Sequence, residues 1–273
     1  MAIALDSCGY SLLALAGRPP RPILENVDEL QQLPRTELIL ITTPDDAIAE
    51  VAQRLTVCET GRSRKPTVLH TSGALSSEVL SPLAQLGFHT GSLHPLVSIS
   101  EPRAGAKALR GAFYCLEGDK KALQIARRIV EDLQGKSFSI RPESKALYHA
   151  AAVMASPHLV ALFDLAAEML ASAGVSKSRA RPILLPLIDS TVNNLMAFTP
   201  EKALTGTFAR GDVATVRRHL EALKIPSLKQ LAVALEVYKL LGRHSLELAE
   251  KNGLDRKLAE EIKNLLIDSH HIS

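Results

Sequence analysis

Residues 67–97 constrain the fold of this chain more than any other stretch. A short apolar run ends at the polar residues 70–73, an amphipathic segment follows, and a second short strand, expected over 88–93, ends at His94. Leucines at helical spacing between two short strands are typical of a parallel βαβ unit. Ligands of such sheets bind beyond the carboxyl ends of the strands. We therefore expect Ser72 and His94 to lie beside a small-molecule site.

The rest of the first half repeats this alternation of strands and helices. Alternation of this kind predicts an α/β fold, a doubly wound parallel sheet with helices on both faces. The further strands are expected at 10–16, 38–43, 112–116 and 136–140, and the further helices at 25–33, 45–55 and 120–133.

After Pro142 the pattern changes to long helical periods, with few glycines or strand-like runs. We therefore place a domain boundary near Arg141, which gives an α/β domain over 1–141 and an all-α domain over 142–273. The apolar stretch 150–174 includes acidic and other polar residues, so we interpret it as a buried helix and expect no membrane span. The helices of this second domain are expected at 143–174, 178–196, 212–223, 228–252 and 255–267.

Charge and cysteine content exclude several classes of protein. The net charge is +3, and no basic block with interleaved aromatic residues is present, so nucleic-acid binding is not expected. The 3 cysteines are odd in number, far apart and without CxxC spacing, which predicts neither disulfides nor a zinc site and favours a reducing cytoplasm. The first residues lack a basic region and reach Asp6 at once, so we do not expect them to be a signal peptide. The adjacent histidines at 270–271 alone make a poor metal site, so no metal is expected.

One expected motif is missing. A dinucleotide-binding sheet normally opens with a central strand and a G-x-G-x-x-G turn that holds the pyrophosphate. Residues 1–8 instead look like the end of a helix stopped by Gly9, as if about 15–20 residues upstream were absent, because that much chain builds a strand, its turn and part of a helix. Two explanations remain open: a start codon placed too late, or a degenerate chain that binds dinucleotide poorly. Without the first strand, the strands at 10–16 and 38–43 are expected to face a gap of roughly 10 Å, twice the inter-strand spacing, unless they slide together.

Five stretches together resemble a known family: 38–52 (LILITTPDDAIAEVA), 68–74 (VLHTSGA), 91–96 (GSLHPL), 148–156 (YHAAAVMAS) and 203–220 (ALTGTFARGDVATVRRHL). The chain resembles Rossmann-like proteins whose C-terminal half is the domain of unknown function 2520. These are similar to pyrroline-5-carboxylate reductase, prephenate dehydrogenase and 6-phosphogluconate dehydrogenase. The resemblance implies a nicotinamide-cofactor domain, a helical dimerisation domain and an oxidoreductase activity on an unsettled substrate. The missing glycine-rich turn departs from the family.

Residues at the predicted strand ends are candidates for cofactor binding. After the strand at 10–16 the chain offers an arginine and no acidic residue, which favours NADP over NAD, because an acidic residue there would bond the ribose 2′-hydroxyl. The alternative for each candidate is a structural role in a turn. The candidates are Arg18, Thr42, Thr43, Pro44, Ser72 and Gly73.

Catalytic candidates come from one helix face and one strand end. Lys145, Tyr148 and His149 stand at i, i+3 and i+4, so they share a face just past the domain boundary. Hydride transfer to a carbonyl or imine needs a nearby proton donor, and lysine or histidine can serve. We take Lys145, His149 and His94 as the candidates. A solvated lysine, a buried histidine and a turn histidine are the structural alternatives.

The leading hypothesis is a cytoplasmic, homodimeric, NADP-dependent oxidoreductase acting on a small carbonyl, imine or hydroxy compound between the domains. The second hypothesis is a non-catalytic binding or regulatory dimer that has lost dinucleotide binding. The third is a prephenate-dehydrogenase-like enzyme, which needs an arginine-lined pocket for two carboxylates; the sequence offers only Arg210 for it.

Overall fold

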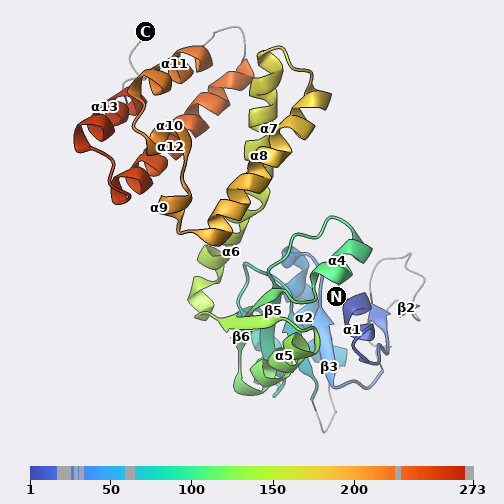
Figure 1. Cartoon of the computed structure of the whole chain (residues 1–273). Helices are drawn as coiled ribbons and strands as arrows, with labels where there is room; N and C mark the ends of the chain where they lie inside the picture. The colour runs from blue at the N-terminus through green and yellow to red at the C-terminus, as the bar shows by residue number, and fades with distance from the viewer. Residues whose placement is uncertain (17–25, 28–29, 31–33, 59–64, 225–228, 268–273) are drawn as a thin grey trace. The chain divides into compact units, whose positions relative to one another are not determined.

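The computed structural model describes residues 1–16, 26–27, 30, 34–58, 65–224 and 229–267 of the 273-residue chain. The chain divides into two compact units, Met1–Pro157 and His158–Ser273. The first contains the sheet, and the second contains helices (Figure 1). Helix α6 (Lys145–Ala155) falls in the sheet unit, so the chain past the expected boundary near Arg141 contributes one more helix to that unit.

A five-stranded sheet forms the centre of the first unit. Its strands pair in the order β3-β4-β5-β6-β7, with three parallel pairs and one antiparallel pair, β5–β6. The expectation of a wholly parallel sheet is therefore wrong at β6, which reverses direction against β5. The strands are β3 (Leu38–Ile41), β4 (Thr67–His70), β5 (His89–Pro95), β6 (Phe113–Gly118) and β7 (Lys136–Ser139).

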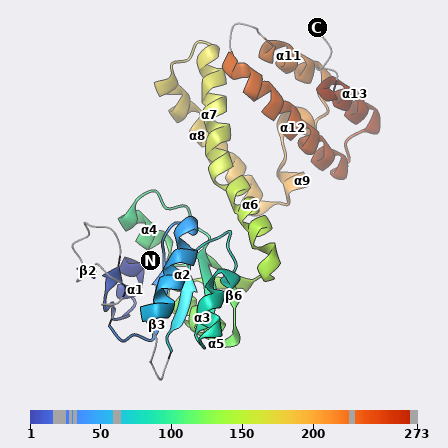
Figure 2. The same ribbon diagram turned by 180° about the vertical axis from the view of Figure 1, so that it is seen from behind.

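Helices cover both faces of this sheet because its strands are apolar on both faces. Val68 packs in one core with α2 (Asp45–Cys58) and α3 (Ser81–Gln85). Leu69, the next residue, packs in the opposite core with α5 (Lys120–Asp132). Figure 1 shows α5 in front of the sheet, and Figure 2 shows α2 and α3 from behind. The predicted doubly wound architecture is thus confirmed.

Short elements connect these layers. They are the 3-10 helix η2 (Ser77–Leu80) before α3, helix α4 (Pro102–Ala108) between β5 and β6, and the 3-10 helix η3 (Pro142–Ser144) before α6. The sequence did not predict α4. This connection lets β6 return antiparallel to β5, so that β6 starts beside the end of β5, where Pro95 faces Tyr114.

The N-terminal residues depart from the prediction. Helix α1 (Ala2–Asp6) is followed by Gly9 at φ +86°, as expected for a helix end stopped by glycine. The expected strand over 10–16 does not join the main sheet. Only β1 (Leu15–Ala16) forms, and it pairs with β2 (Asn26–Val27), where a helix was expected. Their apolar pattern alone therefore does not place them in the main sheet.

A cavity of about 1130 Å³ lies beside β3. Residues 8–14 line one side and residues 36–43 line the other, with side chains of α2 and α5 completing the walls. The gap expected between the strands at 10–16 and 38–43 stays a prediction, because residues 10–14 form no strand beside β3.

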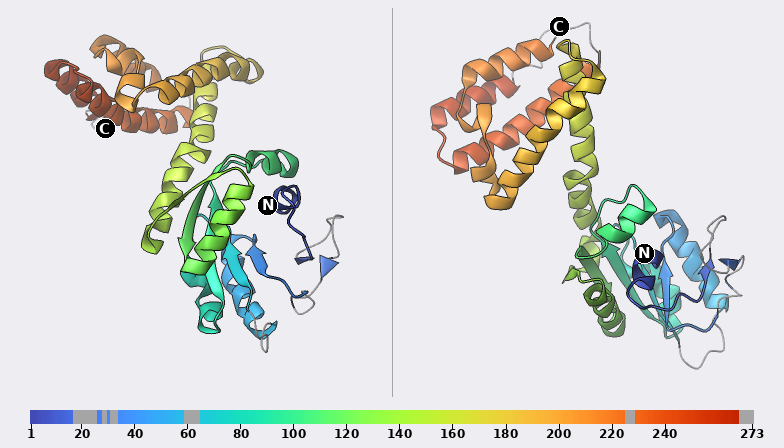
Figure 3. Two further views of the ribbon diagram at one scale, coloured as in Figure 1. Left: turned by 60° about the horizontal axis from the view of Figure 1, so that its bottom comes forward. Right: turned by 45° about the vertical axis from the view of Figure 1, so that its right-hand side comes forward.

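The second unit consists of helices in the part that the structure describes (Figure 3). Its buried core joins α11, α12 and α13 through Val216, Leu220, Leu246 and Ile262. The helices expected over 178–196, 212–223, 228–252 and 255–267 form, whereas the one expected over 143–174 is divided at Ser156 into α6 and α7, and α9 and α10 were not expected. The helices are α7 (Pro157–Ser172), α8 (Lys177–Ala197), α9 (Pro200–Ala203), α10 (Gly206–Ala209), α11 (Val213–Leu223), α12 (Lys229–Lys251) and α13 (Arg256–Ile267).

Helices α7 and α8 expose many large apolar side chains. The expectation that the apolar stretch 150–174 is a buried helix is wrong for the single chain, because α7 has no buried residue. Among the described residues, one helical stretch, Pro142–Ser172, is long and apolar enough to cross a membrane by length and composition. Exposed side chains on α7 and α8 include Leu159, Val160, Leu162, Ile183, Leu187 and Met196.

Candidate functional site

Polar residues gather where β4 and β5 end, as the sequence predicted. His70, the last residue of β4, is fully buried. Its Nδ1 accepts a hydrogen bond from the Ser72 backbone N–H at 3.2 Å, and its Nε2 donates to the Ser76 carbonyl at 3.2 Å. Burial, reinforced by the positive charge of Lys145, lowers the pKa of His70 to about 4. At neutral pH this imidazole is therefore an uncharged structural support for the turn.

The Ser72 side chain stabilises the same turn. Its hydroxyl accepts hydrogen bonds from the backbone N–H groups of Ala74 and Leu75 at 3.1 and 3.0 Å. The side chain is buried, and its carbonyl accepts a hydrogen bond from Lys145. The Ser72 hydroxyl thus shapes the loop after β4. No part of this geometry activates it as a nucleophile.

Lys145 ties the ends of two strands to the start of α6. Its ammonium donates to the Ser72 carbonyl at 3.0 Å and to the Ser92 hydroxyl at 2.8 Å. The side chain is 1% exposed, and burial lowers its pKa. A buried amine costs free energy unless it is hydrogen-bonded, and these acceptors supply the bonds. Lys145 is therefore neither solvated nor open to bulk water.

His94 pairs with Tyr148, which its i+3 spacing from Lys145 predicts to lie on the same helix face. The Tyr148 hydroxyl lies 2.6 Å from His94 Nδ1. Burial raises the pKa of Tyr148, so the phenol keeps its proton at neutral pH. Burial, followed by Lys145 and His149, lowers the pKa of His94 to about 4. His94 is therefore neutral at pH 7.

Two imidazole rings face the backbone of Gly73. A Cβ atom placed on Gly73 would collide with His149 Nδ1 and would lie 2.8 Å from His94 Nε2. The backbone φ of Gly73 is not positive, so close approach is what requires glycine at this position. His149 Nδ1 is buried and has no hydrogen-bond partner among the described residues. The two rings meet edge to face, with centroids 5.8 Å apart.

The end of β3 provides a second group of candidates. Thr42 and Thr43 follow β3 and line the cavity beside it. The Thr43 hydroxyl is buried and also has no partner among the described residues. Pro44 accepts a hydrogen bond from Ala47 as α2 begins. Arg18 lies outside the described residues.

The structure therefore brings together Ser72, Gly73, His94, Lys145 and His149, while Thr42, Thr43 and Pro44 lie at the neighbouring strand end. Contacts that sequence reasoning missed are Tyr148 to His94, Ser92 to Lys145, and the buried Glu117, which accepts hydrogen bonds from the backbone and hydroxyl of Ser77. Only Tyr148 had a signal, its i+3 spacing from Lys145. The described residues contain no cluster of three or more potential metal ligands.

For a nicotinamide dinucleotide the described residues offer one matching group, the unpartnered hydroxyl of Thr43, which could bond an amide. The place that a Cβ of Gly73 would take is already filled by the rings of His94 and His149. The pyrophosphate half has no such support. Helix α2 begins with Asp45 and Asp46, whose charges repel phosphate, and no described strand leads into a glycine-rich turn at a helix N-terminus.

Comparison with protein families identifies the fold. Residues 14–95 match the Rossmann-like domain model, and residues 112–245 match the domain of unknown function DUF2520. The chain belongs to the Rossmann-like proteins that carry the DUF2520 domain. No curated protein matches this Rossmann-like DUF2520 chain.

Solved structures support the fold assignment. Protein TM1727 from Thermotoga maritima is 27% identical, with a TM-score of 0.66 over 84% of this DUF2520 chain and 83% of its own. A Bacteroides fragilis protein described as a candidate NADP oxidoreductase is 21% identical, with a TM-score of 0.68 over 90% of this chain and 92% of its own. The Plasmodium falciparum pyrroline carboxylate reductase, solved with NADP bound, is 11% identical, with a TM-score of 0.56 over 96% and 92%.

Proposed function

We propose that this chain is an NADP-dependent oxidoreductase that acts on a small carbonyl, imine or hydroxy compound. The observation that carries the proposal is the convergence of His94 Nε2 and His149 Nδ1 on the bare backbone of Gly73, at the carboxyl ends of the strands. The Rossmann-like match and the NADP-linked names of similar folds support the cofactor class. The preference for NADP over NAD rests on Arg18.

In this proposal His94 binds the reacting group. Because its pKa is about 4, it is an uncharged donor at neutral pH, and its Nε2–H bonds to the oxygen or nitrogen of a carbonyl or imine. A neutral imidazole polarises such a group without protonating it fully. Tyr148 holds the ring in the tautomer that places the proton on Nε2. His149 Nδ1 is available as a second hydrogen-bonding group for the same substrate.

Lys145 acts as a positioning residue. Its bonds to Ser72 and Ser92 hold the ends of β4 and β5 in place, and its charge favours neutral His70 and His94. When bound, the nicotinamide would supply the hydride for reduction of a carbonyl or imine and would accept it in oxidation of a hydroxy compound. The chain's own residues orient the substrate and set its polarity.

The cofactor test uses the unpartnered Thr43 hydroxyl. Purified protein is titrated with NADPH and then with NADH while reduced-nicotinamide fluorescence is followed. Thr43→Val should weaken NADPH binding about 3–10-fold, the worth of one hydrogen bond, and should leave the melting temperature unchanged or higher, because a buried hydroxyl without a partner costs stability. Thr56→Val, which removes a hydroxyl bonded within α2, is the matched control and should leave affinity unchanged.

The result also separates the competing functions. Saturable NADPH binding that Thr43→Val weakens supports the oxidoreductase. If neither nucleotide binds, the proposal fails, and a binding or regulatory dimer without dinucleotide is favoured. The lack of a described pyrophosphate cradle is the observation behind that second function.

We further propose that the chain forms a homodimer through its helical unit. The exposed apolar side chains of α7 and α8 are the support, because contiguous apolar surface of this kind marks association sites in soluble proteins. A second copy of this chain offers the same surface, so a twofold arrangement would cover both.

A further inference from the structure

Three buried polar side chains stand in one row across the main sheet. In the strand registers His70 of β4 pairs with Ser92 of β5, and Ser92 pairs with Glu117 of β6. Residues that pair in this way point to the same face of a sheet. All three side chains are buried. The row is therefore a buried polar stripe, and each of its members needs hydrogen-bond partners within the fold.

Glu117 has its partners at the end of the loop that follows β4. Its Oε2 accepts a hydrogen bond from the Ser77 backbone N–H at 2.8 Å, and its Oε1 accepts one from the Ser77 hydroxyl. Ser77 is the first residue of η2, and residues 71–76 before it form the loop that carries Gly73. His70 bonds to the same loop from β4. Two strands therefore hold one loop, and Glu117 holds the end that leads into η2.

The ammonium of Lys145 meets the middle of the row. It donates to the Ser92 hydroxyl and to the Ser72 carbonyl, so its hydrogen-bond partners among the described residues are uncharged oxygens. A buried ammonium with uncharged partners alone costs free energy, because hydrogen bonds replace only part of its lost hydration. A negative charge close to Lys145 offsets the remainder, so the buried carboxylate on the strand next to Ser92 is relevant to it.

Glu117 is the buried group that supplies this charge. Burial lowers the pKa of Lys145, and negative charge at three groups opposes that fall. The groups are Cys115, Glu117 and Asp45. Burial raises the pKa of Cys115, so this thiol is uncharged at neutral pH. Asp45 is exposed, so water and salt screen its carboxylate, whereas that of Glu117 is enclosed by protein.

We propose that Glu117 is a positioning residue of the site, which anchors the loop that carries Gly73 and balances the charge of the buried Lys145. This assignment rests on the proposed function, because it is there that the loop and the imidazoles meet a substrate. The anchor sets where the Gly73 backbone lies against His94 and His149. The balanced ammonium stays charged and, together with burial, keeps His94 neutral.

Three substitutions separate the anchor from the charge. Glu117→Gln removes the charge but keeps both bonds, because its amide oxygen accepts from the Ser77 N–H and its amide N–H donates to the Ser77 hydroxyl. Ser77→Ala removes the hydroxyl bond and keeps the charge. Glu117→Ala removes the charge and both bonds. The full chain and these variants are compared by NMR with isotope-labelled lysine, and Lys145→Arg identifies the Lys145 signal.

The charge is measured as the midpoint of the Lys145 titration. Glu117→Gln should lower this midpoint by about one pH unit, the lower end of what a nearby opposite charge contributes. Ser77→Ala should leave it unchanged, since the carboxylate remains. Lys239, the buried lysine of the helical unit that pairs with Glu236, is the internal control and should respond in neither variant. An equal Lys145 midpoint in the parent and in Glu117→Gln would overturn the proposal.

The anchor is measured as amide hydrogen exchange at Ser77 and as the amide chemical shift of Gly73. Glu117→Ala should speed exchange at Ser77 about 10-fold, because this N–H loses its acceptor, and should move the Gly73 signal. Glu117→Gln should return both values towards the parent, a rescue that a general loss of stability does not produce. If Glu117→Ala does not fold, Ser77→Ala gives the Gly73 shift instead. A Gly73 signal that neither variant moves would contradict the anchor.

None of these measurements involves NADPH or a substrate, so the two proposals fail separately. If the Lys145 midpoint and the Ser77 exchange respond as expected but no nucleotide binds, Glu117 remains the anchor and the counter-charge of this loop, and the oxidoreductase is rejected. If NADPH binds but the midpoint and the exchange do not respond, the role of Glu117 is rejected and the oxidoreductase stands.

Discussion

At the scale of single residues, Gly73 is the tightest constraint in the site. Gly73→Ala adds a Cβ that collides with His149 Nδ1 and reaches His94 Nε2. We expect a loss of about 1–3 kcal/mol in the free energy of unfolding, typical of overpacking in a well-packed region, measured by chemical denaturation. In the double variant Gly73→Ala/His149→Ala the added methyl group has room, so most of the loss should return. A loss equal to the sum of the two single variants would contradict the collision.

His70 gives the folded protein a defined pH dependence. Its pKa is about 4 in the folded chain and about 6.5 when unfolded, so between these values the unfolded chain binds a proton that the folded chain does not. This contribution to stability is complete above about pH 6.5 and is lost as pH falls towards 4. His94 acts in the same direction.

The measurement is the urea midpoint from pH 7.5 down to pH 4.5. His70→Gln should flatten the fall in stability at acid pH, while substitution of the exposed His244 serves as the control. The lowering of the His70 pKa from about 6.5 to about 4 corresponds to a contribution of about 3 kcal/mol to the free energy of unfolding. An identical slope in the His70→Gln variant and the parent would show that His70 does not titrate as described.

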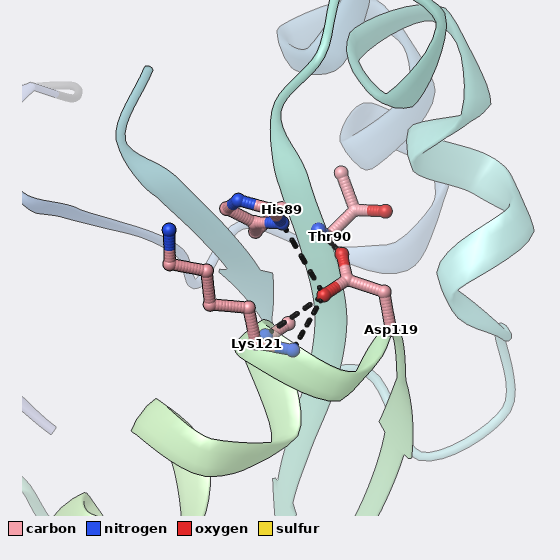
Figure 4. Close-up of polar contacts among 5 residues, drawn as sticks. His89, Thr90, Asp119 and Lys121 are labelled. Atoms are coloured by element: carbon pink, nitrogen blue, oxygen red, sulfur yellow. Dashed lines mark hydrogen bonds and ion pairs between the residues drawn. The ribbon is translucent and has the colours of Figure 1, made fainter. Parts of the chain in front are cut away.

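At the scale of elements, the start of α5 shows how one side chain fixes a helix to a strand. Asp119 accepts hydrogen bonds from the backbone N–H groups of Lys121 and Ala122 at 2.8 and 3.0 Å and from Thr90 of β5 at 2.7 Å, with His89 3.4 Å away (Figure 4). Burial acts to raise the pKa of Asp119, but these three backbone bonds outweigh it and lower the pKa. The carboxylate therefore stays charged and caps α5.

Asp119→Ala should lower the free energy of unfolding by about 1–3 kcal/mol, because it removes a helix cap and leaves the Thr90 N–H without its partner. Asp119→Asn retains acceptor capacity and should cost less. Asp212→Ala, which removes the cap of α11 in the other unit, is the comparison. If Asp119→Ala costs no more than Asp212→Ala, the bond to Thr90 contributes nothing measurable.

Elements with strong local signals were predictable from the sequence. Strands β3 and β4 and helix α5 form where apolar runs and helical spacing predict them, because the layers packed on both faces of the sheet bury these apolar side chains. The direction of β6 was not predictable, since an apolar run does not indicate whether the neighbouring strand is parallel or antiparallel. Residues 10–16 show the limit most clearly: their pattern suits a buried strand, but a strand also needs a neighbour.

The candidate site was predictable to a similar degree. The spacing of Lys145, Tyr148 and His149 placed them on one helix face, and all three do meet the strand ends. Their partners Ser92 and Gly73 are distant in sequence, so only the folded chain shows that Lys145 is enclosed. No local pattern carries that information.

At the scale of the whole molecule, the proposed dimer predicts a specific sensitivity. Leu187 on α8 is 65% exposed in the single chain, and a lysine there would place a charge inside the proposed interface. We expect Leu187→Lys to shift the protein from dimer to monomer in analytical ultracentrifugation, with Val160→Lys on α7 acting in the same way. Leu86→Lys, an exposed leucine of the sheet unit, is the control. If the parent protein sediments as a monomer at every concentration, the proposed dimer is wrong.

The enclosed amine of Lys145 has a consequence for chemical labelling. Reagents that methylate or acylate lysines react with solvent-facing amines, so a side chain that is 1% exposed should resist them until the strand ends separate. The helical unit has a counterpart in Lys239, which is 4% exposed. Labelling rates at these two positions, followed by mass spectrometry, would therefore measure how often each half of the chain opens locally. The measurement can also be made in a cell extract.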